Sequence, residues 1–246
     1  MGWEDFWHWN RPILDLGNAS GRNFFYLFIN PFWHNLGGKD FFMENKNKIL
    51  SARGIAEIAI LTAIAFGLDF LQGGLWRGVF TNGGSIGLAM IPILLLCYRR
   101  GFISGLISGF VLSFLQMLGG VYAISDTWYN VFLQIGLDYI FAYPVVALAG
   151  LFFKPFQNAN NNKDRIKWII VGTTIGGVAK FMCHFLAGIL FWKNFAFKAG
   201  PYVYSLVYNG GYMLPNIIIA AVILIIILLK APQLLIEEKK GEEIHE

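Results

Sequence analysis

Several polar side chains lie inside stretches of sequence that are otherwise apolar. Asp138 and His184 occupy two such stretches, and Tyr204 and Asn209 begin a third. Trp192 follows His184 by eight residues, which places both near one face of a helix. A carboxylate can balance a positive charge, an imidazole and an amide can bond ring nitrogens, and aromatic faces can stack. If these groups share one depth, they predict a pocket for a small polar heterocycle, including a cationic one.

A purely structural interpretation of the same residues stays open. Asp138 and Lys180 would then form an ion pair within the membrane, and His184 would bond a backbone carbonyl. Trp192 would belong to the aromatic belt at the membrane surface. Spanning a bilayer requires none of these polar groups, so their convergence favours a binding site.

The composition indicates where these residues must be held. The 246 residues are 56% hydrophobic and 14% charged, and the mean hydropathy is +0.55. Soluble domains carry about a quarter charged residues, so this chain is predicted to be an integral membrane protein. Intrinsic disorder, nucleic-acid binding and a disulfide-stapled secreted scaffold are excluded, and an ordinary soluble enzyme is disfavoured.

Six apolar segments predict an all-α, polytopic membrane protein with six transmembrane helices in one bundle. The second segment is short and Pro92 interrupts it, so we expect a tilted, kinked or partial span. The segments are 54–71, 86–98, 101–118, 128–153, 168–192 and 203–230.

The distribution of basic residues predicts the orientation. With both termini in the cytoplasm, the inner side carries twelve Lys and Arg residues and the outer loops carry three. We expect a juxtamembrane extension of unknown role over residues 1–50, a six-helix substrate-binding domain over 51–232 and a charged cytoplasmic tail over 233–246. The segment from Lys154 to Lys167 is predicted to be a polar, water-exposed loop.

Small residues recur at helical spacing in two segments. Such a face lets another helix approach closely, either from a partner protein or from within the chain. For the first segment both interpretations stay open, whereas in the third segment we favour internal packing. The two sets are Ala52, Ala56, Ala59 and Ala63, and Gly101, Gly105 and Gly109.

Signatures of catalysis are missing from the sequence. It contains no G-x-x-x-x-G-K-[ST] string for ATP binding, no G-x-S-x-G and no H-E-x-x-H. No enzyme activity, metal site or cofactor is predicted. A membrane-embedded hydrolase using Asp138 and His184, and a purely structural membrane subunit, are the alternatives from other classes.

Five strings resemble one family, in order and with matching spacing over residues 51–232. The chain is similar to the thiamine-specific substrate-binding component of energy-coupling-factor transporters, the ThiT family. The strings are EIAILTAIAFGLDFL (57–71), IGLAMIPILLLCYRRG (86–101), LDYIFAYPVVALAGLF (137–152), HFLAGILFW (184–192) and YSLVYNGGY (204–212).

The resemblance implies roles for individual residues. Asp138 would face the aminopyrimidine or the thiazolium charge of thiamine, and Trp192 would stack on the ligand. Where the family has a second tryptophan, this chain has Phe197. The positions that match pyrimidine-binding residues are His184, Tyr204 and Asn209, and Tyr139 and Tyr122 match further pocket residues.

The resemblance also implies a mechanism. The loop over residues 72–85, with Trp76, would close over the ligand, and its glycines suit a hinge. Ala59 and Ala63 would dock on a transmembrane coupling subunit, whose two cytoplasmic ATPase subunits drive uptake across a prokaryotic plasma membrane. Thiamine would be the transported ligand. Another vitamin, or the hydroxymethyl pyrimidine precursor of thiamine, stays open as the ligand.

Overall fold

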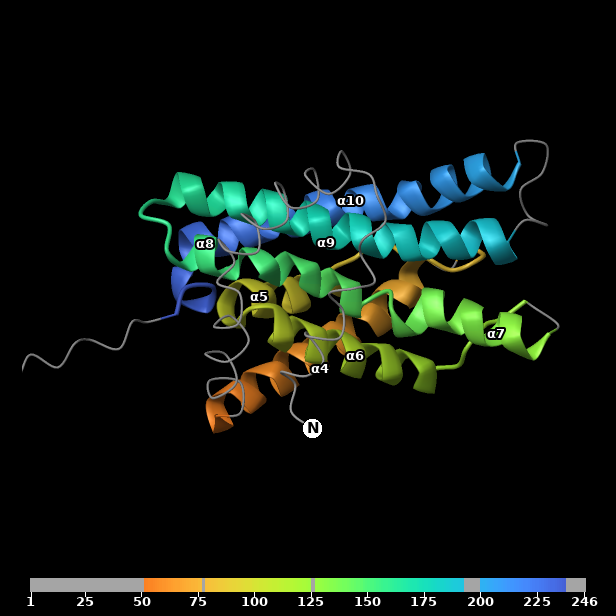
Figure 1. Ribbon diagram of the computed structural model, residues 1–246, viewed down its shortest axis with the longest axis horizontal. Helices are drawn as coiled ribbons and strands as arrows, with labels where there is room; N and C mark the ends of the chain where they lie inside the picture. Colours follow the sequence, from red (N-terminus) through yellow and green to blue (C-terminus); the bar gives the residue numbers. More distant parts are fainter. Residues whose placement is uncertain (1–50, 77, 125–126, 193–199, 238–246) are drawn as a thin grey trace, which may run out of the picture. The chain divides into compact units, whose positions relative to one another are not determined.

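The computed structural model describes residues 51–76, 78–124, 127–192 and 200–237, and these ranges contain helices and no strand. The predicted all-α class is therefore confirmed. The expected extension (1–50), the last residues of the expected tail (238–246) and Phe197 lie outside the described residues. The principal helices are α4 (Ala52–Trp76), α5 (Met90–Arg100), α6 (Phe102–Leu118), α7 (Trp128–Ile135), α8 (Phe153–Gln157), α9 (Asn162–Phe191) and α10 (Pro201–Lys230) (Figure 1).

The six predicted segments correspond in order to six helical segments. On length and composition, α4, α9 and α10 can each cross a membrane. The fourth segment is bent by 41° and counts as one further span if both of its halves are joined. α6 has 17 residues and α5 has 11, which is short for a bilayer core about 30 Å thick. The number of spans and the side of each terminus stay predictions.

α5 is the shortest of the six segments, and Pro92 does not interrupt it. The helix begins at Met90, so Pro92 lies in the first turn, where a missing N–H leaves no internal bond unmade. All but one of its eleven residues are buried. Gly101, with a φ of +86°, then separates α5 from α6.

α9 begins earlier than expected, inside the stretch predicted to be a loop. Asn161 caps it: the side-chain Oδ1 accepts the backbone N–H of Asp164 at 2.9 Å, and Nδ2 donates to the Asp164 carboxylate at 2.8 Å. The first of these bonds satisfies one of the free N–H groups at the helix start, which favours a helix that begins here. The capping residues were visible in the sequence, but the charges around them favoured a loop.

The centre of the bundle is the 3-10 helix η2 (Pro144–Phe152), which packs on α5, α6 and α9. Glycines allow this close approach. A Cβ on Gly109 would lie 2.7 Å from the Pro144 backbone, and one on Gly176 would lie 2.6 Å from the Val146 carbonyl. A Cβ on Gly105 would collide with Cys97 Sγ. The internal packing predicted for the glycines of the third segment is therefore confirmed at Gly105 and Gly109.

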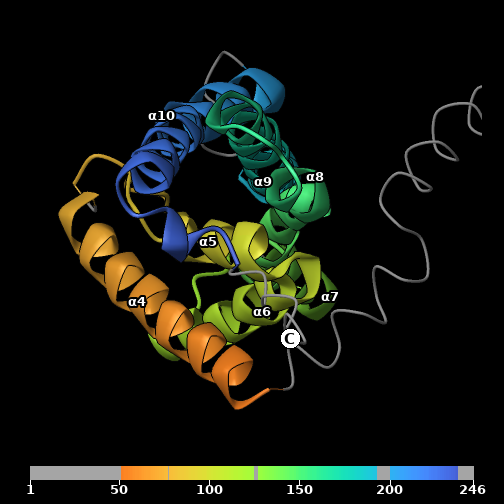
Figure 2. The ribbon, with the colours of Figure 1, turned by 90° about the vertical axis from the view of Figure 1, so that its left-hand side faces the viewer.

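α4 lies at the edge of this arrangement and packs on α5 and α6 (Figure 2). Its inner face is tied to α6 by a 2.7 Å hydrogen bond between the Thr62 and Ser108 hydroxyls. The alanine face is on the other side. Within the described residues all four of its members are exposed, so these alanines do not pack inside the chain: Ala52, Ala56, Ala59 and Ala63.

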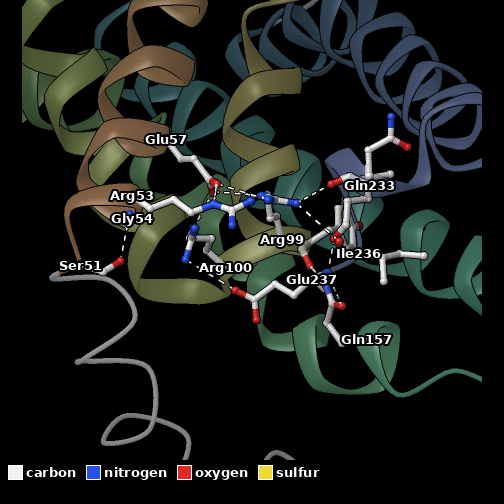
Figure 3. Close-up of polar contacts among 12 residues, drawn as sticks. Ser51, Arg53, Gly54, Glu57, Arg99, Arg100, Gln157, Gln233, Ile236 and Glu237 are labelled. Carbon is white, nitrogen blue, oxygen red and sulfur yellow. Dashed lines mark hydrogen bonds and ion pairs between the residues drawn. The ribbon is translucent and has the colours of Figure 1, made fainter. Parts of the chain in front are cut away.

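A cluster of ion pairs joins the start of α4, the end of α5 and the segment after α10. Glu57 accepts from Arg99 Nε at 2.9 Å and from Arg100 Nε at 2.6 Å, and Arg100 Nη1 also lies 3.6 Å from Glu237 (Figure 3). Arg99 Nη1 donates to the Gln233 carbonyl at 2.6 Å. We call these five residues the Glu57 clasp. The clasp fastens the segment after α10 to the start of α4 and the end of α5.

Candidate binding cavity

A cavity of about 440 Å³ lies among α4, α6, α9, α10 and the bent fourth segment, under the connection between α4 and α5. Pockets for small ligands have volumes of this order. Its wall combines ionisable, amide and aromatic side chains. These include Asp69, Gln72, Gln116, Asp138, Tyr139, Tyr143, Lys180, His184, Trp192, Tyr204, Tyr208, Asn209, Tyr212 and Asn216.

A π-helical turn, η1 (Gly136–Ile140), supplies the acid. α7 leads into it, and the Phe141 N–H closes the widened turn on the Gly136 carbonyl at 2.9 Å. In an α-helix, consecutive residues point about 100° apart. Here Asp138 and Tyr139 both line the cavity. Single π turns recur at functional sites.

One face of α9 supplies the basic groups. Lys180, His184 and Gly188 are four residues apart, and Trp192 follows at the same interval as the helix ends. All four line the cavity. Gly188 lets α10 come close, because a Cβ there would collide with Ser205 Oγ. The α9–α10 pair runs side by side along its length (Figure 1).

Asp138 and His184 contact each other directly. His184 Nδ1 lies 3.2 Å from Asp138 Oδ1, and both side chains are mostly buried. This pair fixes the orientation of the imidazole, and Nε2 has no hydrogen-bond partner among the described residues. With Nδ1 donating to the carboxylate, a neutral imidazole presents Nε2 as an acceptor, so a ligand donor can bond either Nε2 or a remaining lone pair of Asp138.

α10 contributes a ladder of aromatic and amide side chains. The Tyr204 and Tyr208 rings stack with centroids 5.4 Å apart. Asn209 donates to the His184 carbonyl at 3.2 Å and to Ser205 Oγ at 3.0 Å, while its Oδ1 accepts from Tyr212 Oη at 2.7 Å. Asn209 thus holds α9 and Tyr212 in place and keeps acceptor capacity on Oδ1.

The connection between α4 and α5 folds across this ladder. The Asn82 N–H donates to Tyr208 Oη at 3.0 Å, and Tyr208 Oη donates to the Gly83 carbonyl at 2.7 Å. The Gly87 N–H donates to Asn216 Oδ1 at 2.7 Å. Phe80 packs edge-on against Tyr212 with centroids 5.5 Å apart. We call residues 78–89 the lid, because they cover the cavity through these contacts with α10 and through a hydrogen bond from the Ala89 N–H to Gln72 on α4.

The predicted site residues can now be placed. Eight of the ten line the cavity, and Trp192 packs on Tyr122 with ring centroids 5.7 Å apart. Trp76 does not line it. The helix α4 extends through Trp76, beyond its predicted end, and the centroids of the Trp76 and Phe80 rings lie 5.9 Å apart. The eight are Tyr122, Asp138, Tyr139, Lys180, His184, Trp192, Tyr204 and Asn209.

The ion pair considered for Asp138 and Lys180 does not form in the described residues, since Asp138 pairs with His184. Lys180 instead lies over the Tyr143 ring, with Nζ 3.2 Å from the centroid. The His184 side chain therefore contacts a carboxylate and not a backbone carbonyl. The backbone carbonyl of His184 accepts a hydrogen bond from Asn209.

Sequence reasoning missed Asp69, a second carboxylate on the cavity wall. It accepts from Tyr143 Oη at 2.7 Å and from Gln116 Nε2 at 2.5 Å. The available signal was an acid near the end of an apolar segment, which is costly without partners. Groups of three or more possible metal ligands do not occur in the part of the chain that the structure describes.

A helical membrane bundle that encloses a lidded polar cavity of this size is a membrane protein that binds a small solute. The model of the family described as Thiamine transporter protein (Thia_YuaJ) matches residues 55–236. The chain therefore belongs to this thiamine transporter family. Membership confirms the predicted resemblance and shows a transport protein rather than an enzyme.

Individual relatives agree with this assignment. The chain is 34% identical over 189 residues to the thiamine transporter ThiT of Bacillus subtilis, covering 75% of this chain and 95% of ThiT. It is 33% identical over 193 residues to ThiT of Lacticaseibacillus paracasei, covering 74% and 90%. A solved structure of ThiT from Listeria monocytogenes matches with a TM-score of 0.64 and 32% identity, covering 76% of this chain and all of that one.

Proposed function

We propose that this protein binds thiamine in the lidded cavity and delivers it inward as the substrate-binding component of an energy-coupling-factor transporter. The observation that carries the proposal is the pairing of Asp138 with His184 on a cavity wall rich in aromatic rings, in a member of the thiamine transporter family. The proposed setting is the plasma membrane of a prokaryote.

The chemistry of thiamine fits this wall. The exocyclic amine of its pyrimidine can donate to Asp138 or to His184 Nε2, and a ring nitrogen can accept from a tyrosine hydroxyl. Its thiazolium ring carries a positive charge, which a carboxylate and the faces of Trp192 and Tyr122 can stabilise. The lid would then exclude water, which strengthens each of these contacts.

A titration of the purified protein with thiamine tests the ligand. We expect saturable quenching of tryptophan fluorescence at submicromolar thiamine, lost or much reduced in Trp192→Phe because Trp192 would stack on the ligand. Trp168→Phe is the matched control, since Trp168 stacks on Phe152 and does not line the cavity. Riboflavin and the hydroxymethyl pyrimidine serve as comparators. A response to a comparator but not to thiamine would replace the substrate.

The exposed alanine face of α4 supports the second part of the proposal, docking on a transmembrane coupling subunit that two cytoplasmic ATPases drive. Its members are exposed although α4 packs on two other helices, so a partner helix can approach this face closely. The double variant Ala59→Leu, Ala63→Leu should bind thiamine normally and lose uptake in cells that supply the partners.

Thr174→Leu is the control for that experiment, because Thr174 is an exposed position on α9, away from the alanine face. It should retain uptake. Unchanged uptake in the double alanine variant would reject docking through this face and leave the ligand assignment intact.

A further inference from the structure

We infer that Asp69 is a second anionic contact for the ligand, and that it makes the cavity select a cationic solute over a neutral one of the same shape. The inference rests on the proposed function and deepens it. Asp69 lies on α4, whereas Asp138 and His184 lie on η1 and α9, and all three line the same cavity.

The hydrogen-bond partners of Asp69 stabilise its charge without neutralising it, and the Lys180 ammonium acts on it electrostatically from beyond ion-pair distance. Its Oδ1 accepts from Tyr143 Oη at 2.7 Å and from Gln72 Nε2 at 3.1 Å, and its Oδ2 accepts from Gln116 Nε2 at 2.5 Å. All three donors are neutral. They replace the solvation that water would give to a carboxylate, which can accept about four hydrogen bonds. The negative charge therefore remains available to the cavity that Asp69 lines.

The charges on the wall do not cancel. Of the described side chains that line the cavity, two are carboxylates, Asp69 and Asp138, and one is a lysine, Lys180. With His184 neutral, the wall carries one net negative charge. Lys180 has no carboxylate within ion-pair distance among the described residues, and its ammonium rests on the Tyr143 ring at 3.2 Å. A monocationic ligand would balance this wall.

Asp69 is also joined to the lid. Gln72, which donates to Asp69, accepts from the Ala89 N–H through Oε1 at 3.3 Å. The same glutamine thus contacts the carboxylate and the end of the segment that closes the cavity. A cation held near Asp69 would lie beside this contact, where closure of the lid would shield the pair from water.

Isothermal titration of the full-length wild type and Asp69→Asn with two ligands tests the inference. The ligands are thiamine and deazathiamine, in which a neutral thiophene replaces the thiazolium ring. Wild type should bind thiamine more tightly. In Asp69→Asn, affinity for thiamine should fall about tenfold or more while affinity for deazathiamine changes little, because only one ligand loses a charge partner. An equal loss for both ligands, or no loss, would overturn the inference.

Two further variants separate charge from structure. Asp69→Glu keeps the charge and should keep the preference for thiamine, even if its longer side chain weakens both ligands. Asp164→Asn makes the same chemical change at an exposed helix cap and should leave both affinities unchanged. Loss of the preference in Asp69→Glu would overturn the role of the charge. If the wild type binds neither ligand, the proposed function itself fails, which is a different result.

Discussion

The cavity and the Glu57 clasp are two polar clusters on the same helix, and they use charge in opposite ways. Glu57 and Asp69 are twelve residues apart on α4, about 18 Å along the helix axis. In the clasp, Glu57 bonds Arg99 and Arg100, and Arg100 also reaches Glu237. In the cavity, the hydrogen-bond donors of Asp69 are all neutral, and Lys180 lies on an aromatic face with no described carboxylate within ion-pair distance.

The difference separates a structural cluster from a binding cluster. Paired charges that bridge α4, α5 and the segment after α10 hold the fold together and have little left to offer a ligand. Charges that are solvated but not paired keep their interaction energy for a solute. Substitutions in one cluster should therefore leave the property of the other unchanged, and three experiments measure how far this separation holds.

The largest effect is expected from Asp138→Asn in the cavity. Removing the charge from a mostly buried carboxylate that pairs with His184 should weaken thiamine binding about a hundredfold, or about 3 kcal/mol. Calorimetric titration measures the affinity, and thermal unfolding of the ligand-free protein in detergent should change little. Near-wild-type affinity would mean that Asp138 does not contact thiamine. The cavity could then no longer be contrasted with the clasp as a binding cluster.

A smaller effect is expected from Glu57→Gln in the clasp, and it should lower the stability of the protein rather than its affinity for thiamine. Arg100 is 7% exposed and would lose its shortest carboxylate contact, at a cost of about 2 kcal/mol, between the values for buried and exposed pairs. Thermal unfolding should detect this loss, while thiamine affinity stays the same.

Arg53→Gln controls for charge removal at the same end of α4. Arg53 also bonds Glu57, but it is 70% exposed, so its loss should cost about 0.5 kcal/mol or less. Equal destabilisation by Glu57→Gln and Arg53→Gln would mean that the contacts with Arg99 and Arg100 add little stability.

The third experiment concerns the lid, and its expected effect is smaller than those of Asp138→Asn and Glu57→Gln. Gly84 has a φ of +95°, and a Cβ there would lie 2.5 Å from the Tyr212 ring. Gly84→Ala should therefore disfavour the closed lid and weaken thiamine binding about tenfold, mainly through faster dissociation. Stopped-flow fluorescence measures the rate. Gly78→Ala, at a position with open space and no positive φ, should behave as the wild type.

Local sequence patterns predicted the helical segments and several of the residues that line the cavity. Apolar runs of helical length predict six helical segments, because a backbone in a bilayer must satisfy its own hydrogen bonds. Helical spacing for His184 and Trp192, and a shared depth for Asp138, predicted that these three residues belong to one site. The structure places all three on the cavity wall. The alanine spacing predicted a face, although spacing alone left open whether that face packs inside the chain.

Other features depend on residues that are far apart in the sequence. Gln116 and Tyr143 are 47 and 74 residues from Asp69, so of its three hydrogen-bond donors only Gln72 lies near it in the sequence. The contact of Asn82 with Tyr208 and the contact of Arg99 with Gln233 span 126 and 134 residues. The π turn at Asp138 has no local signature either, since its sequence also fits an α-helix.

The sequence by itself determined which segments are helical, which of them carry polar groups into the membrane, and which face of α4 is lined with alanine. Those properties follow from the period of the helix and the cost of transferring each side chain from water. Only the tertiary structure decided that Asp138 pairs with His184 rather than Lys180, and that Asp69 joins the cavity. Partner choice among buried polar groups depends on how the helices pack, because bonds of a few ångströms join residues that the chain separates widely.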